Sequence, residues 1–309
     1  MKEKIRELLL SSGAVAVGFT KAGKVTEEVS KKYSGWIEAG NHAGMSYLVR
    51  HIKLRKNTDN VLPNAKTVIS LAFSYSPKER RNPDLPMIAG YALGCDYHDV
   101  IRKRLTPLVS ELIRNYGGDW RICVDSAPME ERFWAVKSGL GFIGRNGALI
   151  VEGCGSYCFL AEILTTVEME QDKSMQNDCL NCGKCIKACP SGAINSDCTI
   201  DSRKCLSYIT IEKKGDFNND EKKLLTKTKT GILFGCDICL DVCPHNADIT
   251  PSSIEEFKAN DEMIALTAKA ILDMDETQIR ESFKHSPVKR AGFNGMIRNA
   301  TSIISPSQD

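Results

Sequence analysis

The sequence predicts an α+β protein in which a mixed α/β region precedes a cysteine-rich region and a short helical end. Three observations lead to this prediction. The first half alternates segments of helical and strand-like periodicity, as helices packed on a central sheet do. The middle holds most of the 13 cysteines at close spacing. The last part opens with "SSIEEF", which offers a helix N-cap and an acidic first turn.

We therefore expect three parts along the chain, at 1–170, 171–250 and 251–309. In the first part, helices are expected at 2–11, 26–40, 44–55 and 97–116, and strands at 14–19, 67–75, 87–92, 120–125 and 159–165. The cysteine-rich part should be short on regular structure, because ligation replaces the burial of a core. Its residues 212–231 form a polar insertion.

The composition is that of a globular protein, with 42% hydrophobic and 26% charged residues. No apolar stretch approaches the ~20 residues that cross a bilayer, and the first helix carries acidic residues that a signal peptide lacks. We expect a cytoplasmic protein with no membrane partner. Basic residues cluster in segments such as "IRKRL" (101–105) and "SPVKRAGFNGMIRNA" (286–300). These clusters permit an RNA partner, although solvated helix faces also explain each of them.

The cysteine spacing points to iron–sulfur clusters. "CLNCGKCIKACP" (179–190) reads C-x2-C-x2-C-x3-C-P, the run of bacterial two-cluster ferredoxins, whose fourth cysteine binds the other cluster. "CDICLDVCP" (236–244) repeats this run without its first cysteine, and Cys205 is the natural replacement. The cross-over rule then assigns two sets of ligands for two [4Fe-4S] clusters: Cys179, Cys182, Cys185 and Cys243 for one, and Cys205, Cys236, Cys239 and Cys189 for the other.

Structural zinc is the alternative, since C-x2-C pairs also bind zinc, but two copies of the x3-C-P ending disfavour it. The remaining cysteines form no ligand pattern and are expected in the core or near the site: Cys95, Cys123, Cys154, Cys158 and Cys198.

Asp125 ends the strand-like run "WRICVD" and stands before "SAPMEER". Polar residues at strand ends gather at sites, but Asp125 or Ser126 could equally cap a following helix in which Pro128 occupies the first turn. The segment 138–147 then packs four glycines into ten residues, which favours a backbone that approaches a large ligand. It lacks the order of a dinucleotide fingerprint or a P-loop.

Motifs along nearly the whole chain resemble the epoxyqueuosine reductase family. They are "GCDYHDVIRKRL" (94–105), "VDSAPMEERFWAVKSGLGFIGRNGALI" (124–150), "GSYCFLAEILT" (155–165), "CLNCGKCIKACPSGAI" (179–194), "RKCLSYITIEKKG" (203–215), "FGCDICLDVCPHN" (234–246) and "SPVKRAGFNGMIRNA" (286–300). The family is distantly similar to cobalamin-dependent reductive dehalogenases. The resemblance implies a cobalamin-binding domain followed by a two-cluster ferredoxin-like domain.

The resemblance also implies the reaction: reduction of epoxyqueuosine to queuosine at the wobble position of tRNA, the last step of queuosine biosynthesis, with electrons reaching cobalamin through the clusters. It makes Asp125 the proton donor, which requires a raised pKa if the acid is to be protonated near neutral pH. Cobalamin is expected base-off. Ile101 stands where the histidine-ligand motif DxHxxG needs glycine, so no protein axial ligand is inferred.

Further residues are carried over by motif. Expected cobalamin contacts, besides Asp125, are Arg55, Asp96, Tyr97, His98, Asn146, Ser156, Tyr157, Ser207 and Gly235. Expected tRNA contacts are Lys213, Lys214, Lys289, Arg290 and Arg298, because phosphates need fixed positive charge. We also expect a low-potential electron donor and a monomer. Many relatives continue into helical repeats, whereas this sequence ends at Asp309, which weakens any expectation of how extensively tRNA is gripped.

Two other functions fit part of the sequence. The chain could be an electron-transfer protein whose first 170 residues dock a partner, or a cobalamin-dependent reductase of another substrate, such as an organohalide. Cobalamin binding would exclude a plain electron-transfer protein. Turnover of epoxyqueuosine-tRNA would distinguish an epoxyqueuosine reductase from a cobalamin-dependent reductase of another substrate.

Overall fold

A four-stranded antiparallel sheet forms the centre of the computed structural model, which describes residues 1–77, 81–175, 177–225 and 227–304. The strand order is β1-β2-β7-β4. The bounds are Ala16–Lys21 for β1, Thr67–Ser74 for β2, Trp120–Cys123 for β4 and Cys158–Thr165 for β7. These are the long apolar runs of the sequence, so the central sheet confirms the expected mixed α+β architecture.

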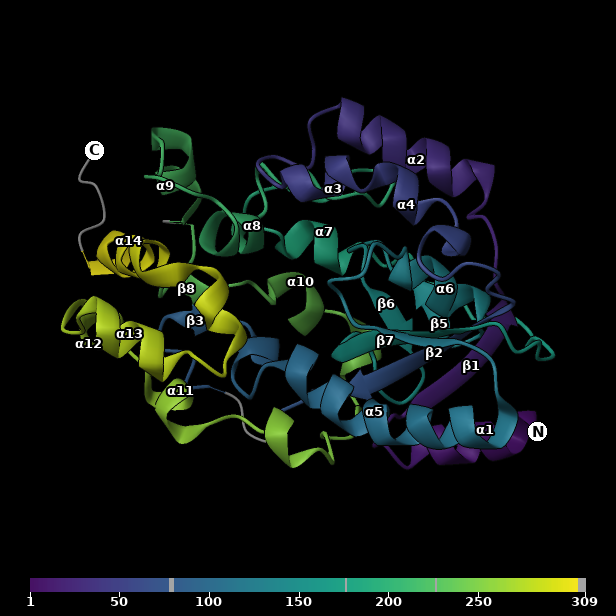
Figure 1. The fold of residues 1–309 in the computed structure, drawn as a ribbon. Coiled ribbons are helices and arrows are strands. Elements are labelled where there is room, and N and C mark those ends of the chain that lie inside the picture. The colour runs from purple at the N-terminus through teal and green to yellow at the C-terminus, as the bar shows by residue number, and fades with distance from the viewer. Residues whose placement is uncertain (78–80, 176, 226, 305–309) are drawn as a thin grey trace.

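Helices cover both faces of this sheet (Figure 1). Alternate residues of β2 point to opposite faces. Ile69, Leu71 and Phe73 pack with α1 (Lys2–Leu10) and α5 (Tyr97–Tyr116). On the other face, β2 contacts α6 (Glu131–Lys137) and the Ser70 and Ser138 hydroxyls lie 3.2 Å apart. With both faces covered, every residue of β2 is buried, which explains its nearly continuous apolar sequence.

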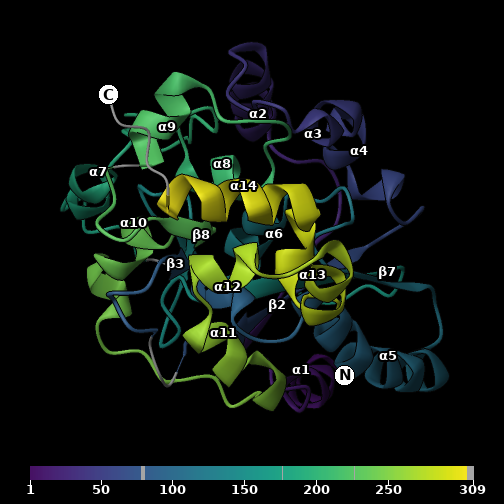
Figure 2. The same ribbon diagram turned by 90° about the vertical axis from the view of Figure 1, so that its left-hand side faces the viewer.

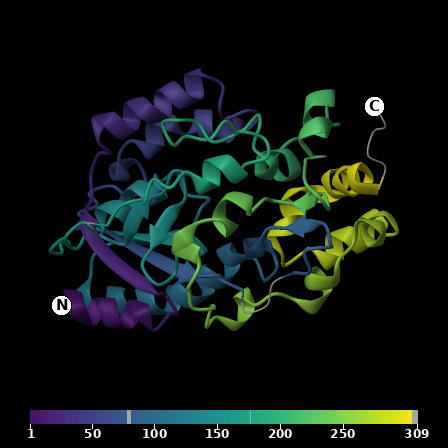
Figure 3. The same ribbon diagram turned by 180° about the vertical axis from the view of Figure 1, so that it is seen from behind.

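A second hydrophobic core joins distant parts of the chain. β3 (Met87–Ile88) pairs in parallel with β8 (Ile232–Phe234), and both pack against four helices. These are α11 (Asp261–Ala265), α12 (Ala268–Leu272), α13 (Glu276–Ser282) and α14 (Gly292–Ile304). Figure 2 shows α12, α13 and α14 gathered together, and Figure 3 shows them beside the central sheet. Residues 87–93 thus share a core with the C-terminal helices, although they precede the expected boundary at 170.

The remaining elements are short. The expected helix at 26–40 is α2 (Glu27–Glu38), and the one at 44–55 is split into α3 (Ser46–Arg50) and α4 (Ile52–Arg55). The cysteine-rich region holds α7 (Lys184–Ala188), α8 (Leu206–Ile211), α9 (Asn219–Leu225) and α10 (Ile238–Asp241). An unexpected hairpin joins β5 (Gly141–Ile143) to β6 (Leu149–Val151). Within the described ranges, no helix combines the length and apolar character that crossing a membrane requires.

Substitution of Gly18 tests how closely β1 packs on the segment after α6. A Cβ built there would lie 2.0 Å from the carbonyl oxygen of Ser138. We expect Gly18→Ala to lower the free energy of unfolding by about 1–3 kcal/mol, because the backbone must shift. The matched control is Gly35→Ala on α2, where nothing lies within 4 Å of the added carbon and helix propensity should stabilise the protein slightly. Thermal unfolding of both variants checks this, and equal effects would contradict it.

Candidate functional site

Asp125 lies in a loop between β4 and α6, not at the start of a helix. Its φ of 50° is unusual for a residue with a side chain. Its backbone N–H donates to Glu131 Oε1 at 2.7 Å, and α6 begins only at Glu131. The N-cap position is Glu130, which makes no side-chain cap bond. The interpretation of Asp125 or Ser126 as a cap, with Pro128 in the first turn, is therefore wrong, and the carboxylate stays available.

Four charged groups form a row that ends at this carboxylate. His98 Nε2 lies 3.1 Å from Asp125 Oδ2, and its Nδ1 lies 2.7 Å from Asp96 Oδ1. Asp96 also caps α5 by accepting from the His98 backbone N–H at 3.0 Å. Its other oxygen pairs with Lys289 Nζ at 2.7 Å. The cap therefore fixes the imidazole between two carboxylates.

The row determines where the proton resides. Burial alone would lower the pKa of His98, but hydrogen bonds to Asp125 and Asp96 outweigh it and raise the pKa to about 9. The hydrogen bond from His98 in turn lowers the pKa of Asp125, against the opposing effect of burial. The expectation of a raised pKa for Asp125 is thus wrong for the protein alone. Near neutral pH the site holds an imidazolium beside a carboxylate.

Two further carboxyl groups lie near Asp125, and the sequence reasoning missed both as site residues. Burial raises the pKa of Glu131 to about 8, and the nearby Asp125 adds to this rise. Glu162 of β7 is fully buried, and neither of its carboxyl oxygens has a hydrogen-bond partner among the described residues. Burial raises the pKa of Glu162 well above its usual value, with Glu131 and Asp125 adding to the effect. The sequence signal that could have identified Glu162 is a single acidic residue within the apolar run "FLAEILT" (159–165).

The cysteines of the two motifs come together in two groups. Cys179, Cys182, Cys185 and Cys243 line one cavity. In the second group, Cys236 and Cys239 interact electrostatically with each other, with Cys189 and with Cys205. Each group thus takes its last member from the other motif, which is the grouping that the cross-over rule predicts.

Backbone N–H groups point at several of these sulfurs. Ala193 N donates to Cys189 Sγ at 3.4 Å, and similar bonds reach Cys205 from Ser207 and Tyr208 and Cys236 from Ile238. Such bonds stabilise thiolates. Among the described residues, no three His, Cys, Asp or Glu side chains converge closely enough to hold one metal ion. The four thiols of the first group line a small cavity.

The residues expected to contact cobalamin fall into two sets. Near Asp125 lie Arg55, Asp96, Tyr97 and His98, with the Tyr97 ring stacked on both His98 and Phe159. The other set borders the second cysteine group or the segment after it. Asn146 donates to Cys239 O, the backbone N–H of Ser207 donates to the Cys205 sulfur, and Gly235 precedes Cys236. Ser156 is hydrogen-bonded to Asn246, and Tyr157 is hydrogen-bonded to Asp241.

Tyr75 and Tyr91 connect these two sets. Both interact with Asp237, which follows Cys236, and Tyr91 also makes an edge contact with the Tyr97 ring. A continuous group of aromatic rings thus leads from the second cysteine group to the residues around Asp125.

The glycine-rich segment has an internal explanation. A Cβ at Gly141 would lie 1.9 Å from the carbonyl oxygen of Ile150 in the β5–β6 hairpin, and one at Gly139 would lie 2.5 Å from the carbonyl oxygen of Lys173. These glycines let the chain pack on itself. The inference that they admit a large ligand is therefore not supported by their contacts.

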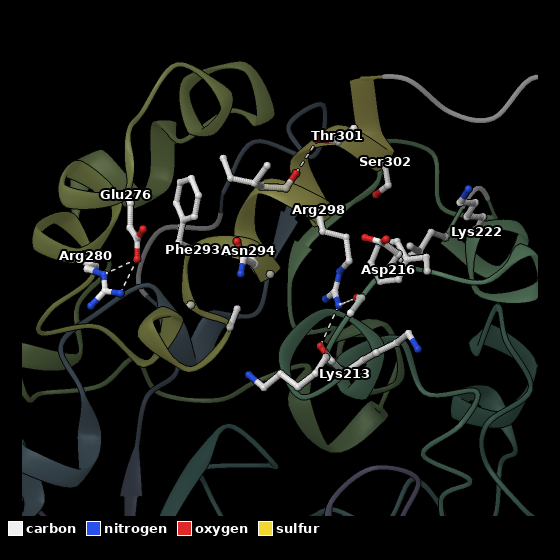
Figure 4. A pocket seen from close by; sticks show the side chains of 18 residues that line it. Lys213, Asp216, Lys222, Glu276, Arg280, Phe293, Asn294, Arg298, Thr301 and Ser302 are labelled. Atoms are coloured by element: carbon white, nitrogen blue, oxygen red, sulfur yellow. Dashed lines mark hydrogen bonds and ion pairs between the residues drawn. The ribbon is translucent and has the colours of Figure 1, made fainter.

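Most of the cations expected at tRNA are bound to their own chain. Lys213 pairs with Glu221 at 3.2 Å, Lys289 with Asp96, and Arg290 with both oxygens of Glu212. Arg298 is half-buried and donates to the carbonyl oxygens of Ile209, Lys213 and Gly215 (Figure 4). Its guanidinium holds a loop, so its expected role as a phosphate contact is corrected to a structural one. Lys214 has no recorded partner among the described residues.

Comparisons with known proteins agree along the chain. Residues 55–126 match the family described as "Epoxyqueuosine reductase QueG, DUF1730", and residues 178–246 match the "4Fe-4S double cluster binding domain". An epoxyqueuosine reductase from Cellulophaga algicola is 34% identical over 96% of this chain and 97% of its own.

Two solved structures are similar at 26% identity over 98% of this chain. An epoxyqueuosine reductase crystallised with an epoxyqueuosine-modified tRNA stem loop superposes with a TM-score of 0.88 and 80% of that chain covered. The Bacillus subtilis epoxyqueuosine reductase superposes with a TM-score of 0.87 over 81% of that chain, and its aspartate catalytic loop is described as swung out of the active site.

His98→Gln tests the proton position. The folded-state pKa of about 9 exceeds the ordinary value of ~6.5, so His98 stabilises the fold fully below pH ~6.5 and loses this effect as pH rises through 9. We expect the variant to be less stable by up to about 3 kcal/mol at pH 6 and the difference to shrink by pH 10. Anaerobic thermal unfolding across pH measures it, with exposed His51→Gln as control. A difference that does not change with pH would refute the assignment.

Proposed function

Since the chain belongs to the epoxyqueuosine reductase family and is an oxidoreductase, we propose that it reduces epoxyqueuosine to queuosine at the wobble position of tRNA. The conversion of an epoxide to an alkene and water consumes two electrons and two protons. A protein for this reaction needs an electron path and a proton source that meet at one place. The row of charged groups that ends at Asp125 would supply the proton source. This row is the observation that carries the proposal beyond family membership.

Two [4Fe-4S] clusters would bind at the two cysteine groups. Cys179, Cys182, Cys185 and Cys243 would hold one, and Cys189, Cys205, Cys236 and Cys239 the other. Their grouping and the N–H groups aimed at their sulfurs support this assignment. Because Tyr75 and Tyr91 lead from Asp237 toward Asp125, the second cluster would lie nearer the reacting substrate. A low-potential donor would supply the electrons.

Cobalamin would bind between this cluster and Asp125. The residues fit a group rich in amide side chains. Arg55 Nε is buried and has no hydrogen-bond partner in the described part of the chain, and 58% of the Asp125 side-chain surface is exposed. Both nitrogens of His98 are engaged by carboxylates, which favours cobalamin without that axial ligand. When bound, it would supply a cobalt centre that collects single electrons and delivers them to a carbon–oxygen bond.

The side chains would hold and move the proton. His98 carries it at Nε2, 3.1 Å from Asp125 Oδ2. Transfer to Oδ2 makes Asp125 a carboxylic acid, which can protonate the departing epoxide oxygen, since an alkoxide leaves poorly. Asp96 keeps the imidazole in place and stabilises its charge after each new proton arrives. Asp125 is thus the proposed donor and His98 the group that reloads it.

The other candidate functions explain less of this arrangement. An electron-transfer protein needs no imidazolium held between two carboxylates at the end of an aromatic path. An organohalide reductase would use similar cofactors, so the substrate decides. We propose that the chain works on tRNA in the cytoplasm and as a monomer. An anaerobic assay with epoxyqueuosine-tRNA, with and without cobalamin, is the direct test. Binding of cobalamin without turnover of this tRNA would favour another substrate.

Asp125→Asn should abolish most turnover while leaving the cofactors bound. The amide cannot donate an acidic proton, and a positioned general acid contributes ~10²–10⁴-fold to rate. We expect kcat to fall at least 100-fold, with iron content and cobalamin binding unchanged. The control is Asp273→Asn, an exposed aspartate of the C-terminal part. Full activity in Asp125→Asn would remove this residue from the mechanism.

Cys205→Ala should remove one cluster selectively. The replaced thiol belongs to the second group, so we expect about half of the iron of the wild-type protein, which should hold eight irons for two clusters. Iron analysis and electron paramagnetic resonance of the reduced protein measure this. Cys95→Ala is the matched control, because Cys95 is exposed and lies outside both groups. Retention of both clusters in Cys205→Ala would overturn the ligand assignment.

A further inference from the structure

A cavity of about 950 Å³ lies away from the cysteine groups, between the insertion that follows α8 and the C-terminal helices. One wall is the loop 213–217 with α9, and the other is formed by α13 and α14. Figure 4 shows Phe293 and Asn294 on one side and Asp216 and Lys222 on the other. The cavity is large enough for a ligand of several rings, and nothing in the proposed chemistry uses it.

The charge of the cavity is positive. Its lining includes five cationic side chains and two acidic ones, Asp216 and Glu276. Three of the cations are committed, since Lys213 pairs with Glu221, Arg280 pairs with Glu276 and Arg298 holds backbone carbonyls. Lys214 and Lys222 are exposed, and no hydrogen bond or ion pair of either side chain is recorded among the described residues. Two ammonium groups without such a bond therefore line the cavity and favour an anionic ligand.

Phe293 gives the cavity an aromatic surface. It lies at the start of α14, is partly exposed and lines the cavity next to the exposed Asn294. It packs against the second hydrophobic core and makes no aromatic contact within the described ranges. Ammonium groups for phosphates, a partly exposed ring for stacking and an amide for base edges are the groups that proteins use to bind single-stranded RNA.

The cavity lies a short distance along the chain from the row that ends at Asp125. Lys289, which pairs with Asp96, is four residues before Phe293, so their Cα atoms lie within ~15 Å of each other. A second connection runs through Tyr47, which interacts electrostatically with Asp125 and with the Glu212–Arg290 pair beside Lys213. An RNA strand with one base at Asp125 can therefore place a nearby nucleotide at this cavity.

We propose that this cavity binds an unpaired nucleotide close to the modified one, with its base stacked on Phe293 and the flanking phosphates at Lys214 and Lys222. This inference rests on the proposed function, because it takes tRNA as the ligand. It identifies the part of the substrate that is gripped outside the reacting site. It also moves the phosphate contacts from Arg298, which is structural, to two lysines that are free to make them.

The binding test uses the cluster-loaded protein and an unmodified anticodon stem-loop RNA labelled for fluorescence anisotropy. We expect Lys214→Glu/Lys222→Glu to raise Kd at least tenfold and to flatten the dependence of log Kd on log salt concentration by about 1.4, because two single-strand phosphate contacts are lost. Phe293→Ala should raise Kd about 5-fold or more through lost stacking. The matched control is Lys4→Glu/Lys269→Glu, which reverses two exposed lysines elsewhere. Iron content shows that each variant is folded.

A second measurement locates the nucleotide. Stem-loops are prepared with one abasic position each, and Kd is measured for Phe293→Ala and for the wild type. At most positions the Kd of the variant should exceed that of the wild type by the same factor. At the position whose base stacks on Phe293, the two Kd values should be about equal. In the tRNA reduction assay, KM should rise and kcat at saturating tRNA should stay the same, because Asp125 and His98 are untouched.

Unchanged Kd and KM in the lysine and phenylalanine variants, with normal reduction by the wild type, would overturn this inference and leave the proposed function standing. Stem-loop binding that depends on these residues, in a protein that does not reduce epoxyqueuosine-tRNA, would support the cavity and reject the reaction. A wild-type protein that does not bind the stem-loop would reject the cavity as well.

Discussion

The imidazole of His98, held between two carboxylates, is the interaction on which the site depends. Asp96 performs three tasks with one side chain: it caps α5, orients the ring of His98 and binds Lys289 from the segment before α14. The sheet domain and the C-terminal helices are thereby tied together next to Asp125. Because the same bonds raise the pKa of His98, the element that orders the backbone also stores the proton.

This arrangement lets an aspartate act as an acid although its own pKa is low. Burial without a hydrogen-bond partner among the described residues raises the pKa of a carboxyl group, as it does for Glu162. Asp125 is more exposed and has an imidazolium in contact. The proton is therefore kept on nitrogen, close to the carboxylate and within reach of solvent through the half-exposed Lys289 end of the row. Burial raises the pKa of both Glu131 and Glu162, and the charge of Asp125 adds to each rise, so further negative charge is disfavoured around Asp125.

Sequence patterns predicted the parts of the structure that local periodicity or spacing determines. The four strands of the central sheet and the long α5 are apolar runs with the right period, and the cysteine grouping follows from ligand spacing. The strand expected at 87–92 is only β3 (Met87–Ile88), followed by a 3-10 turn at Gly90–Ala92. Its pairing with β8 and the hairpin 141–151 could not be predicted, because strands of two or three residues exist only through their partners. The site was likewise predictable only in part. Asp125 stood out in the sequence because it ends a strand-like run, whereas the position of the proton depends on His98, which lies 27 residues earlier in the chain. The role of Arg298 was missed for the same reason, since its three carbonyl partners come from another segment.

Arg298 gives the C-terminal helix a hold on the cysteine-rich region. One guanidinium fastens the carbonyls of Ile209, Lys213 and Gly215, while Asn299 beside it binds the carbonyls of Thr210 and Leu233. The segment between Cys205 and Cys236 thus owes its shape to two adjacent side chains on α14. A chain cleaved ahead of Gly292 would keep all its cysteines yet release this lysine-rich loop to proteases. Without α14, these five backbone carbonyl groups would lose their side-chain donors although every cysteine would still be present.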